Sequence, residues 1–552
     1  MGKTHKFSIM SRRVTLTGAP GFSENTSRTN LKKKHKQHDS QQSHTPRPPR
    51  ACHNSAEARH AHVTVIFTID SSRAAPLVDE KVSKRAARAT VSLHTVVHAK
   101  ERRMSTGNPA PPTAANPDGW HFETKQVQAG HTPDAVTGAR AIPIYQSTSF
   151  VFPDAAEAAD RFALASLGPI YTRLDNPTNQ IVASRIASLE GGVGAHLVAS
   201  GLAAETLTFL TLGGAGSSIV SSPSLYGGSV NLLTRTLPKL GITTRFVEDP
   251  GDPAAWSAAA DEHTICFFGE SIPNPKGDIL DIAPIAEAAH RLGIPLVVDN
   301  TTASPYLTRP IEWGADIVVE SATKFLGGHG SSVAGVVVDS GNFDYAAAAE
   351  RFPDFNTPDP SYTDLVYARD MGVGGAMGAN MAFILKAHAQ GQRDLGFAAS
   401  PLGAFLIAQG VETLSLRMER HVDNALAVAR WLVDRPEVAE VRYSGLPSSP
   451  YYDLHRTYCP RGAGSVFAFD LVGGREAGAA FIDALSLFSN LANIGDVRSL
   501  CVHPATTTHS QLDDAGLARA GISAGTVRLS IGIEHVDDII ADLERGLAAL
   551  AG

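Results

Sequence analysis

The stretch Glu320-Ser-Ala-Thr-Lys-Phe-Leu-Gly-Gly-His-Gly330 decides the fold. It follows the apolar run Asp316-Ile-Val-Val-Glu320, which predicts a buried strand with Lys324 just past its carboxyl end, where open α/β sheets bind their ligands. Burial lowers the pKa of a lysine there, and a neutral amine can form a Schiff base with a carbonyl group. Ser321 and Thr323 offer hydroxyls to a phosphate, and the following glycines let the backbone approach a flat ligand.

A second strand pattern upstream ends on an acid. The run Ile294-Pro-Leu-Val-Val-Asp-Asn300 is apolar as far as Asp299. A carboxylate at a strand end beside a Schiff-base lysine suits pyridoxal phosphate, because it keeps the pyridine nitrogen protonated and the ring an electron sink. For Asp299 taken alone, an N-cap of a helix beginning at Asn300-Thr-Thr is the better interpretation.

The composition indicates a long acidic chain with a basic beginning. At 552 residues it exceeds one typical domain, so two or three are expected. Residues 1–103 hold 20 Lys and Arg against 7 Asp and Glu, which leaves 28 against 48 for the remainder, a net charge of −20. An acidic body suits a soluble cytoplasmic enzyme and argues against nucleic-acid binding there. No apolar run approaches membrane-spanning length, so no membrane partner is expected.

Cysteine and histidine spacing predicts no metal site. The cysteines have neither metal-ligand nor redox spacing, which favours buried, reduced thiols. The spacing of three histidines in the second half of the chain supplies no ligand set, and these histidines are expected to form structural hydrogen bonds. These residues are Cys52, Cys266, Cys459 and Cys501, and His329, His503 and His509.

Residues 1–103 differ from the rest of the chain. They contain Lys32-Lys-Lys-His-Lys36 and Pro46-Arg-Pro-Pro-Arg50, with little apolar periodicity. Three interpretations compete: a transit peptide, a nucleic-acid-binding arm, or a segment that is not native sequence. We favour the third, an over-extended gene reading, because Met104 opens a plausible start and Lys100-Glu101 can be encoded by a ribosome-binding sequence. If translated, the segment is expected to be disordered.

From Trp120 onward, patterns of strand and helix alternate. On an extended strand Tyr171 and Arg173 would point the same way, as a pair gripping one phosphate requires. After a strand at 195–199, Ser200-Gly201 forms a turn into an amphipathic helix at 202–210, whose first amides could hold a phosphate or simply carry a Ser cap. Tyr226, before Gly-Gly, could stack on a planar ring, although such a tyrosine is usually only part of a turn.

This alternation predicts an α/β fold with a large, doubly wound, mostly parallel sheet. We expect an extended N-terminal arm at 104–165, a large domain at 166–395 and a smaller α+β C-terminal domain at 396–552.

In this order the pieces resemble the Cys/Met-metabolism family of pyridoxal-phosphate enzymes, from about Glu123 to the C-terminus. The motifs that carry the resemblance are Tyr171-x-Arg173, Ser200-Gly201-Leu202, Tyr226-Gly-Gly, Glu270 with Asn274-Pro, Asp299-Asn-Thr, Ser321-Ala-Thr-Lys324, Ser499-Leu, His503-Pro-Ala, Thr508-His-Ser and Val527-Arg528-Leu-Ser-Ile-Gly-Ile-Glu534. The resemblance implies a PLP-dependent transferase fold of the aspartate aminotransferase type, fold type I.

The resemblance also implies a role for each site residue. Lys324 would carry pyridoxal 5'-phosphate and shuttle protons, with Asp299 on the ring nitrogen. Arg528 would clamp the substrate carboxylate, which lysine does less well, and Asn493 occupies the place of a serine that helps that grip in many relatives. The remaining cofactor contacts would be Asn274 near the ring's 3-oxygen, Tyr226 stacked on the ring, Gly201, Leu202, Ser321 and Thr323 on the phosphate, and Tyr171 and Arg173 from a neighbouring subunit. A homodimer is then the minimum active unit, and the family is usually tetrameric.

Within the family, three stretches resemble the O-acetylhomoserine sulfhydrylase branch: 352–362, 405–416 and 491–496. The sequence departs from relatives at Glu320, where they often have His, and at Thr363-Asp364, where His-Gly is usual. The resemblance implies γ-replacement, in which O-acetyl-L-homoserine and sulfide give L-homocysteine and acetate, a step of methionine biosynthesis. Cystathionine synthesis or γ-elimination, an O-succinylhomoserine donor and a non-catalytic scaffold remain as alternatives.

Overall fold

The computed structural model describes residues 119–362, 364–507 and 522–550. By its contacts the chain divides into Met1–Ser92 and Leu93–Gly552, and every described residue belongs to the second unit. The predictions made for residues 1–103, for the start of the 104–165 arm, for Thr363 and for His509 lie outside the described residues.

A seven-stranded sheet forms the centre of the described chain, in the order β1-β7-β6-β5-β4-β2-β3. From β3 to β6 neighbouring strands are parallel, whereas β7 runs antiparallel to both β6 and β1. Five of the seven strands have buried apolar runs, as expected for a sheet covered on both faces. Their bounds are β1 (Gly194–Val198), β2 (Ser218–Ser221), β3 (Thr243–Phe246), β4 (Thr264–Glu270), β5 (Leu296–Asp299), β6 (Ile317–Glu320) and β7 (Gly335–Asp339).

Helices cover both faces of this sheet, and alternate strand residues enter two separate cores. One face, with Val298 and Val318, is covered by α2 (Phe122–Gln128), α4 (Pro177–Glu190), α7 (Pro253–Ala259), α8 (Ile282–Arg291) and α14 (Pro401–Val411). The other face, with Val297 and Val319, is covered by α5 (Gly201–Leu212), η1 (Leu232–Thr236), η2 (Leu237–Leu240), α12 (Ala382–Lys386) and η4 (Ala387–Gln392). The prediction of a doubly wound α/β fold is confirmed.

Helix α5 differs from its prediction. An amphipathic helix was expected at 202–210, but α5 is buried over most of its length, including Glu205 and Phe209. The reason is that α5 contacts β6 and β7 on one side and α12 and η4 on the other, so it has no wide solvent face.

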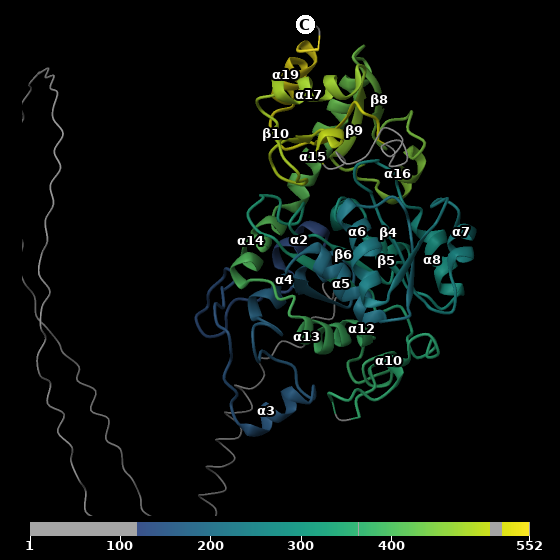
Figure 1. The fold of residues 1–552 in the computed structure, drawn as a ribbon. Helices are drawn as coiled ribbons and strands as arrows, with labels where there is room; N and C mark the ends of the chain where they lie inside the picture. The colour runs from purple at the N-terminus through teal and green to yellow at the C-terminus, as the bar shows by residue number, and fades with distance from the viewer. Residues whose placement is uncertain (1–118, 363, 508–521, 551–552) are drawn as a thin grey trace, which may run out of the picture. The chain divides into compact units, whose positions relative to one another are not determined.

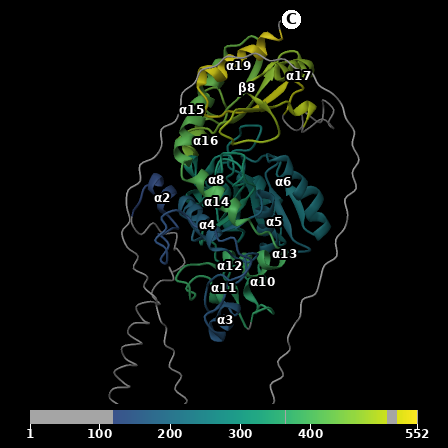
Figure 2. The same cartoon turned by 90° about the vertical axis from the view of Figure 1, so that its left-hand side faces the viewer.

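A second sheet of five strands follows, in the order β10-β11-β12-β9-β8, with only the β10–β11 pair parallel. Phe469 and Leu529 from this sheet share a core with Leu432, Phe481 and Leu543 from the helices. Figures 1 and 2 show these yellow-green elements together at one end of the described chain. The elements are α15 (Leu414–Val433), β8 (Val438–Arg442), α16 (Tyr452–Tyr458), β9 (Val466–Leu471), α17 (Gly474–Ala484), β10 (Ser489–Asn490), β11 (Leu500–Val502), β12 (Thr526–Ser530) and α19 (Val536–Ala548).

Short helices complete the connections: α3 (Ala155–Phe162), α6 (Gly227–Asn231), α9 (Ser304–Leu307), η3 (Pro310–Trp313), α10 (Pro353–Asn356), α11 (Tyr367–Asp370), α13 (Arg393–Leu395) and η5 (Pro504–Thr506). In the described parts of the chain, every helix is too short or too polar to cross a bilayer.

Candidate active site

Three neighbouring strand ends bring the predicted chemistry to one edge of the first sheet. Glu270 ends β4 and lies in register with Asp299, which ends β5. Asp299 in turn lies in register with Val319 of β6, and the loop that carries Ser321 and Lys324 begins two residues later. Because parallel strands end at the same edge, residues up to 54 positions apart meet there.

Asn493 connects Lys324 to Arg528. The Lys324 Nζ donates to Asn493 Oδ1 at 2.5 Å, and Arg528 Nη2 donates to the Asn493 backbone carbonyl at 2.8 Å. Burial, followed by the Arg528 charge, lowers the pKa of Lys324. The lysine and the arginine, predicted to act on one substrate, therefore meet at a single residue of the second sheet's β10–β11 loop.

The Arg528 guanidinium is buried and incompletely satisfied. Burial lowers its pKa to about 10, and its Nε has no hydrogen-bond partner among the described residues. A buried guanidinium that is short of a partner is costly, and a carboxylate supplies the two acceptors that its fork geometry needs. The arrangement fits the predicted binding of a substrate carboxylate.

The start of α5 and the Ser321 loop form a cup for an anion. Ser200 caps the helix by accepting from the Ala203 amide at 3.1 Å. The hydrogen bonds of the described residues leave the Gly201 and Leu202 amides unused, so both can donate to a phosphate. The cup is tight, since a Cβ added to Gly201 would lie 2.8 Å from the Ser321 Cβ.

Thr323 is engaged elsewhere in the loop. Its hydroxyl donates to the Ala334 carbonyl at 3.1 Å and accepts from the Ala334 amide at 3.0 Å. These two bonds connect Thr323 to Ala334 and so join the two ends of the loop that contains Lys324. Phosphate binding by Thr323 stays a prediction, and any such contact must compete with Ala334.

Asp299 lies among buried acids. Its Oδ1 accepts from the Thr301 amide at 2.8 Å, and burial raises its pKa to about 6. Burial, then the Asp299 charge, raises the pKa of Glu205 to about 8 and that of Glu270 well above its ordinary range. Of these three acids, Asp299 is therefore the one that ionises most readily at neutral pH. A partner for a protonated ring nitrogen must be ionised.

Glu270 holds the segment that presents Tyr226. The Tyr226 amide donates to Glu270 Oε1 at 2.5 Å, at the start of α6. Ser229, within α6, donates to Glu205 Oε1 at 2.7 Å. The Tyr226 side chain itself is 52% exposed. From the sequence, Glu270 belonged to a motif but had no predicted role, and Glu205 had none. The signal available was that Glu205 is an acid inside the mostly apolar segment 202–210.

Asn274 follows β4 at the same edge. Its Oδ1 is buried and has no hydrogen-bond partner among the described residues. An unpaired buried amide is costly, so a ligand group at this place would satisfy it.

The prediction of an extended strand carrying Tyr171 and Arg173 is wrong. Only Tyr171 forms a bridge, to Ser149, and the chain then turns, with the amides of Leu174 and Asp175 bonded to the Tyr171 carbonyl. The turn precedes the Asn176 cap of α4, which requires the chain to change direction. The Arg173 guanidinium still lies 5.6 Å from the Tyr171 ring centre.

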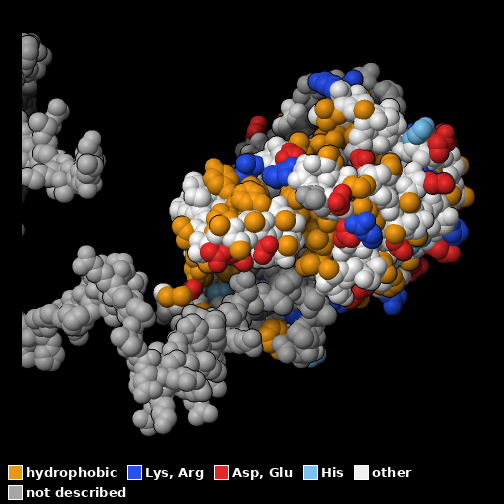
Figure 3. Space-filling model, turned by 90° about the horizontal axis from the view of Figure 1, so that it is seen from below, with side chains coloured by type: hydrophobic (Ala, Val, Ile, Leu, Met, Phe, Trp, Pro, Cys, Tyr) orange, Lys and Arg blue, Asp and Glu red, His pale blue; other side chains and the backbone are white. Residues whose placement is uncertain are grey.

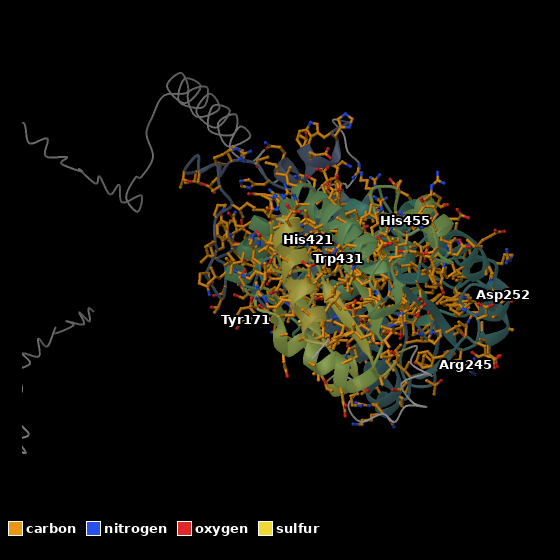
Figure 4. The ribbon with its side chains drawn as sticks, turned by 90° about the horizontal axis from the view of Figure 1, so that it is seen from above. Tyr171, Arg245, Asp252, His421, Trp431 and His455 are labelled. Carbon is orange, nitrogen blue, oxygen red and sulfur yellow. The ribbon has the colours of Figure 1, made fainter. Side chains whose placement is uncertain are left out.

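The Tyr171 turn is tied to a different part of the chain from the cup. Arg173 Nη1 donates to the Arg393 carbonyl, and Gln392 Nε2 donates to the Arg173 carbonyl at 2.8 Å. Figure 4 shows Tyr171 near one edge of the ribbon, on the side opposite Arg245 and Asp252.

The described histidines of the motifs form ordinary hydrogen bonds. His329 Nδ1 lies 2.7 Å from the Gly327 carbonyl, and His503 contacts Thr506 and the Ala524 carbonyl. Within the described ranges, the acidic, histidine and cysteine side chains form no group of three suited to a metal.

A buried lysine, a strand-end carboxylate, an anion cup and unpaired polar atoms at Asn274 and Arg528 fit pyridoxal phosphate and an amino-acid substrate. These features define a pyridoxal-phosphate enzyme built on an α/β sheet. A family profile described as Cys/Met metabolism PLP-dependent enzyme matches residues 123–548, and the chain belongs to that family.

Several characterised proteins are similar to this chain. It is 52% identical to the O-acetyl-L-homoserine sulfhydrylase of Corynebacterium glutamicum over 439 residues, covering 79% of this chain and 99% of the relative. It is 47% identical to a homocysteine synthase of Schizosaccharomyces pombe, covering 77% and 98%.

Solved structures show the same fold. A crystal structure assigned as an O-acetylhomoserine (thiol)-lyase from Campylobacter jejuni, which contains N'-pyridoxyl-lysine-5'-monophosphate, matches with a TM-score of 0.74 and 36% identity. A cystathionine γ-lyase from Lactobacillus plantarum in complex with L-serine matches with a TM-score of 0.66 and 30% identity. Each match covers 78% of this chain and 100% of the other.

Proposed function

We propose that this protein is a PLP-dependent O-acetylhomoserine sulfhydrylase, which converts O-acetyl-L-homoserine and sulfide to L-homocysteine and acetate. The observation that carries the proposal is the Lys324–Asn493–Arg528 bridge, which places a buried amine beside a buried carboxylate clamp. The names of the similar proteins supply the choice of acyl donor and nucleophile.

The cofactor would be held by contacts at both its ends. The Gly201 and Leu202 amides with Ser321 would bind its phosphate, Asp299 its ring nitrogen and Lys324 its aldehyde. The ring would also meet Asn274 and the face of Tyr226. When bound, the cofactor supplies an electron sink that stabilises negative charge on the substrate.

Residues of this chain would then orient the substrate and move its protons. Arg528 would bind the α-carboxylate through two parallel hydrogen bonds and so fix the orientation of the Cα–H bond. The Lys324 amine, whose pKa is already lowered by burial, would remove a proton from Cα. After that proton has passed to the cofactor, the neutral amine would remove a second proton from Cβ. Loss of the Cβ proton lets acetate leave from Cγ. Sulfide then adds at Cγ, and Lys324 returns the protons.

Asn493 gives the Lys324 amine a defined position while it is free. Its Oδ1 can accept from the amine without a charge of its own, so it does not raise the pKa of the base as a carboxylate would. The backbone carbonyl of the same residue holds Arg528 in place before substrate arrives.

We also propose that the active unit is at least a homodimer, and that the enzyme works as a homotetramer in the cytoplasm without nucleic-acid partners. Tyr171 is 41% exposed, and Tyr226, which is bonded to Glu270 at the site, is 52% exposed, so both support a partner surface. Apolar residues are also exposed at the end of α3, where Phe162 is 62% exposed, and in the loop at Val373. Figure 3 shows hydrophobic side chains gathered on the visible part of one face.

The test combines O-acetylhomoserine with either sulfide or cysteine and identifies the products. Homocysteine from sulfide, with little cystathionine from cysteine, would support the proposal. Cystathionine as the main product would replace the proposed reaction by cystathionine synthesis on the same site, and a preference for O-succinylhomoserine would change the donor. The Lys324→Ala variant is the control: an enzyme loses turnover and its yellow absorbance, whereas a scaffold keeps its function.

A further inference from the structure

The last residue of β6, Glu320, points away from the cofactor side of the sheet. Side chains alternate along a strand, and Val319 lies in the same core as α5, the helix of the phosphate cup. Glu320 therefore shares the opposite face with Val318, in the core formed with α4. The side chain is 1% exposed and immediately precedes Ser321 of the cup.

A second buried acid, Glu190, ends α4 on this same face. It is fully buried, and its Oε1 accepts from Asn300 Nδ2 at 2.7 Å. Its Oε2 has no donor among the described residues, and neither oxygen of Glu320 has one. Three carboxyl oxygens from two side chains are thus buried without donors.

Two ionised carboxylates cannot remain here. Among the described residues, the cation whose charge acts on Glu190 is Arg309, which is partly exposed and already paired with Glu312 at 2.5 Å. Asp299 adds another negative charge from across the sheet. Burial, followed by the Glu190 charge, raises the pKa of Glu320 well above its ordinary value, and burial raises that of Glu190 to about 7. Asn300 hydrogen-bonds Glu190 and opposes the latter shift.

We propose that Glu190 and Glu320 hold one proton between them, and that this carboxyl–carboxylate hydrogen bond positions the Ser321 loop for the cofactor phosphate. A proton on one acid turns two of the unpaired oxygens into a donor and its acceptor. The pair then carries a single negative charge, which Asn300 stabilises from the other side. Glu190 and Glu320 are positioning residues, and Glu320 is a position where this sequence departs from the histidine often found in relatives.

The hydrogen bond between Glu190 and Glu320 would complete a connection among α4, β5 and β6 on the face opposite the cofactor. Asn300 follows β5 and donates to Glu190 at the end of α4, while the Thr301 hydroxyl accepts from the Ser321 amide at 2.7 Å. The shared proton adds a direct connection from α4 to the end of β6. The Ser321 loop is then held both through Thr301 and through Glu320.

The sign of the pH effect follows from the raised pKa values. Between the ordinary carboxyl pKa and the folded pKa, the folded chain retains a proton that the unfolded chain has lost. The stabilisation from this pair is complete at acid pH and decreases as pH rises. For each pH unit and each retained proton, the unfolding constant increases about tenfold. Above pH 7 the folded chain retains one proton that the unfolded chain has lost, and Glu190 and Glu320 share it.

The test uses the cofactor-loaded full-length protein and three variants. Glu320→Gln and Glu190→Gln each keep the shape but supply a permanent amide donor, and Glu287→Gln alters an exposed glutamate as the control. Thermal unfolding is followed from pH 7 to pH 9, and infrared spectra at pH 7 record the carbonyl band of a protonated carboxylic acid. Cofactor release into a trapping buffer is measured for wild type, Glu320→Gln and Glu320→Ala.

We expect the unfolding constant of wild type, relative to that of either pair variant, to rise about tenfold for each pH unit above 7. The acid carbonyl band should weaken in both variants and not in the control. Glu320→Gln should hold the cofactor like wild type, whereas Glu320→Ala should release it about tenfold faster, the effect of one lost buried hydrogen bond. Parallel pH curves for wild type and Glu320→Gln, or an unchanged carbonyl band, would overturn the shared proton. Equal release from all three proteins would overturn the positioning role. None of these readouts depends on the acyl donor or the nucleophile.

Discussion

Replacing Arg528 by lysine should weaken substrate binding while leaving the cofactor in place. Arg528 is 8% exposed, donates from Nη2 to the Asn493 carbonyl and has an unused Nε. The fork of the guanidinium can therefore serve Asn493 and a carboxylate at the same time. A lysine is shorter and carries its donors on one nitrogen, so it must give up one of these contacts.

The size of the effect follows from the lost contact. A hydrogen bond to a charged group contributes about 1.5–3 kcal/mol. At about 1.4 kcal/mol for each factor of ten, the loss of one such bond raises the KM for O-acetylhomoserine roughly tenfold to a hundredfold. The kcat should change less, because Lys324 and its neighbours remain in place.

Steady-state kinetics at saturating sulfide measure this change, with cofactor absorbance as the check on loading. Arg442→Lys is the matched control, since Arg442 makes a two-bond contact to Asp470, at 2.8 and 2.7 Å, in the same sheet. The control should lower the thermal midpoint without raising KM. An Arg528→Lys enzyme with unchanged KM would refute the assignment of Arg528 to the substrate carboxylate.

Two further substitutions test the cofactor contacts. Asp299→Asn removes the charge expected at the ring nitrogen, so the rate constant of a single turnover at equal cofactor content should fall about a hundredfold or more, the cost of breaking a buried ion pair. A fully active variant would show that Asp299 serves only to hold the turn at Thr301. Gly201→Ala places a Cβ 2.8 Å from the Ser321 Cβ and should weaken cofactor affinity about tenfold by absorbance titration, whereas Gly214→Ala, with no atom within 4 Å, should not.

The sheet and the edge that carries Lys324 and Asp299 could be predicted because buried parallel strands are short apolar runs. A polar residue that ends such a run must lie at the sheet edge, so the position of Lys324 follows from its neighbours in sequence. The comparisons confirm the fold, the family and the cofactor. The roles of individual residues stay predictions.

Contacts between distant residues could not be predicted in this way. Asn493 and Lys324 are 169 positions apart, and the bond between them depends on how the two sheets meet. The turn at Tyr171 was missed because the chain there is directed by the Asn176 cap rather than by periodicity. The burial of α5 depends on α12 and η4, which lie far along the chain.

The bridge at Asn493 also explains the glycine two residues later. Gly495 has a φ of +72°, and a Cβ there would lie 2.8 Å from the Phe325 amide nitrogen. Only glycine allows this approach. One residue after Asp496, the Val497 amide donates to the Gly328 carbonyl at 2.8 Å, so the β10–β11 loop contacts the backbone that follows Lys324 at both Phe325 and Gly328. Backbone contacts of the β10–β11 loop therefore fix the position of Asn493 beside Lys324. The distance between Lys324 and Arg528 depends on how this loop packs against the Lys324 loop.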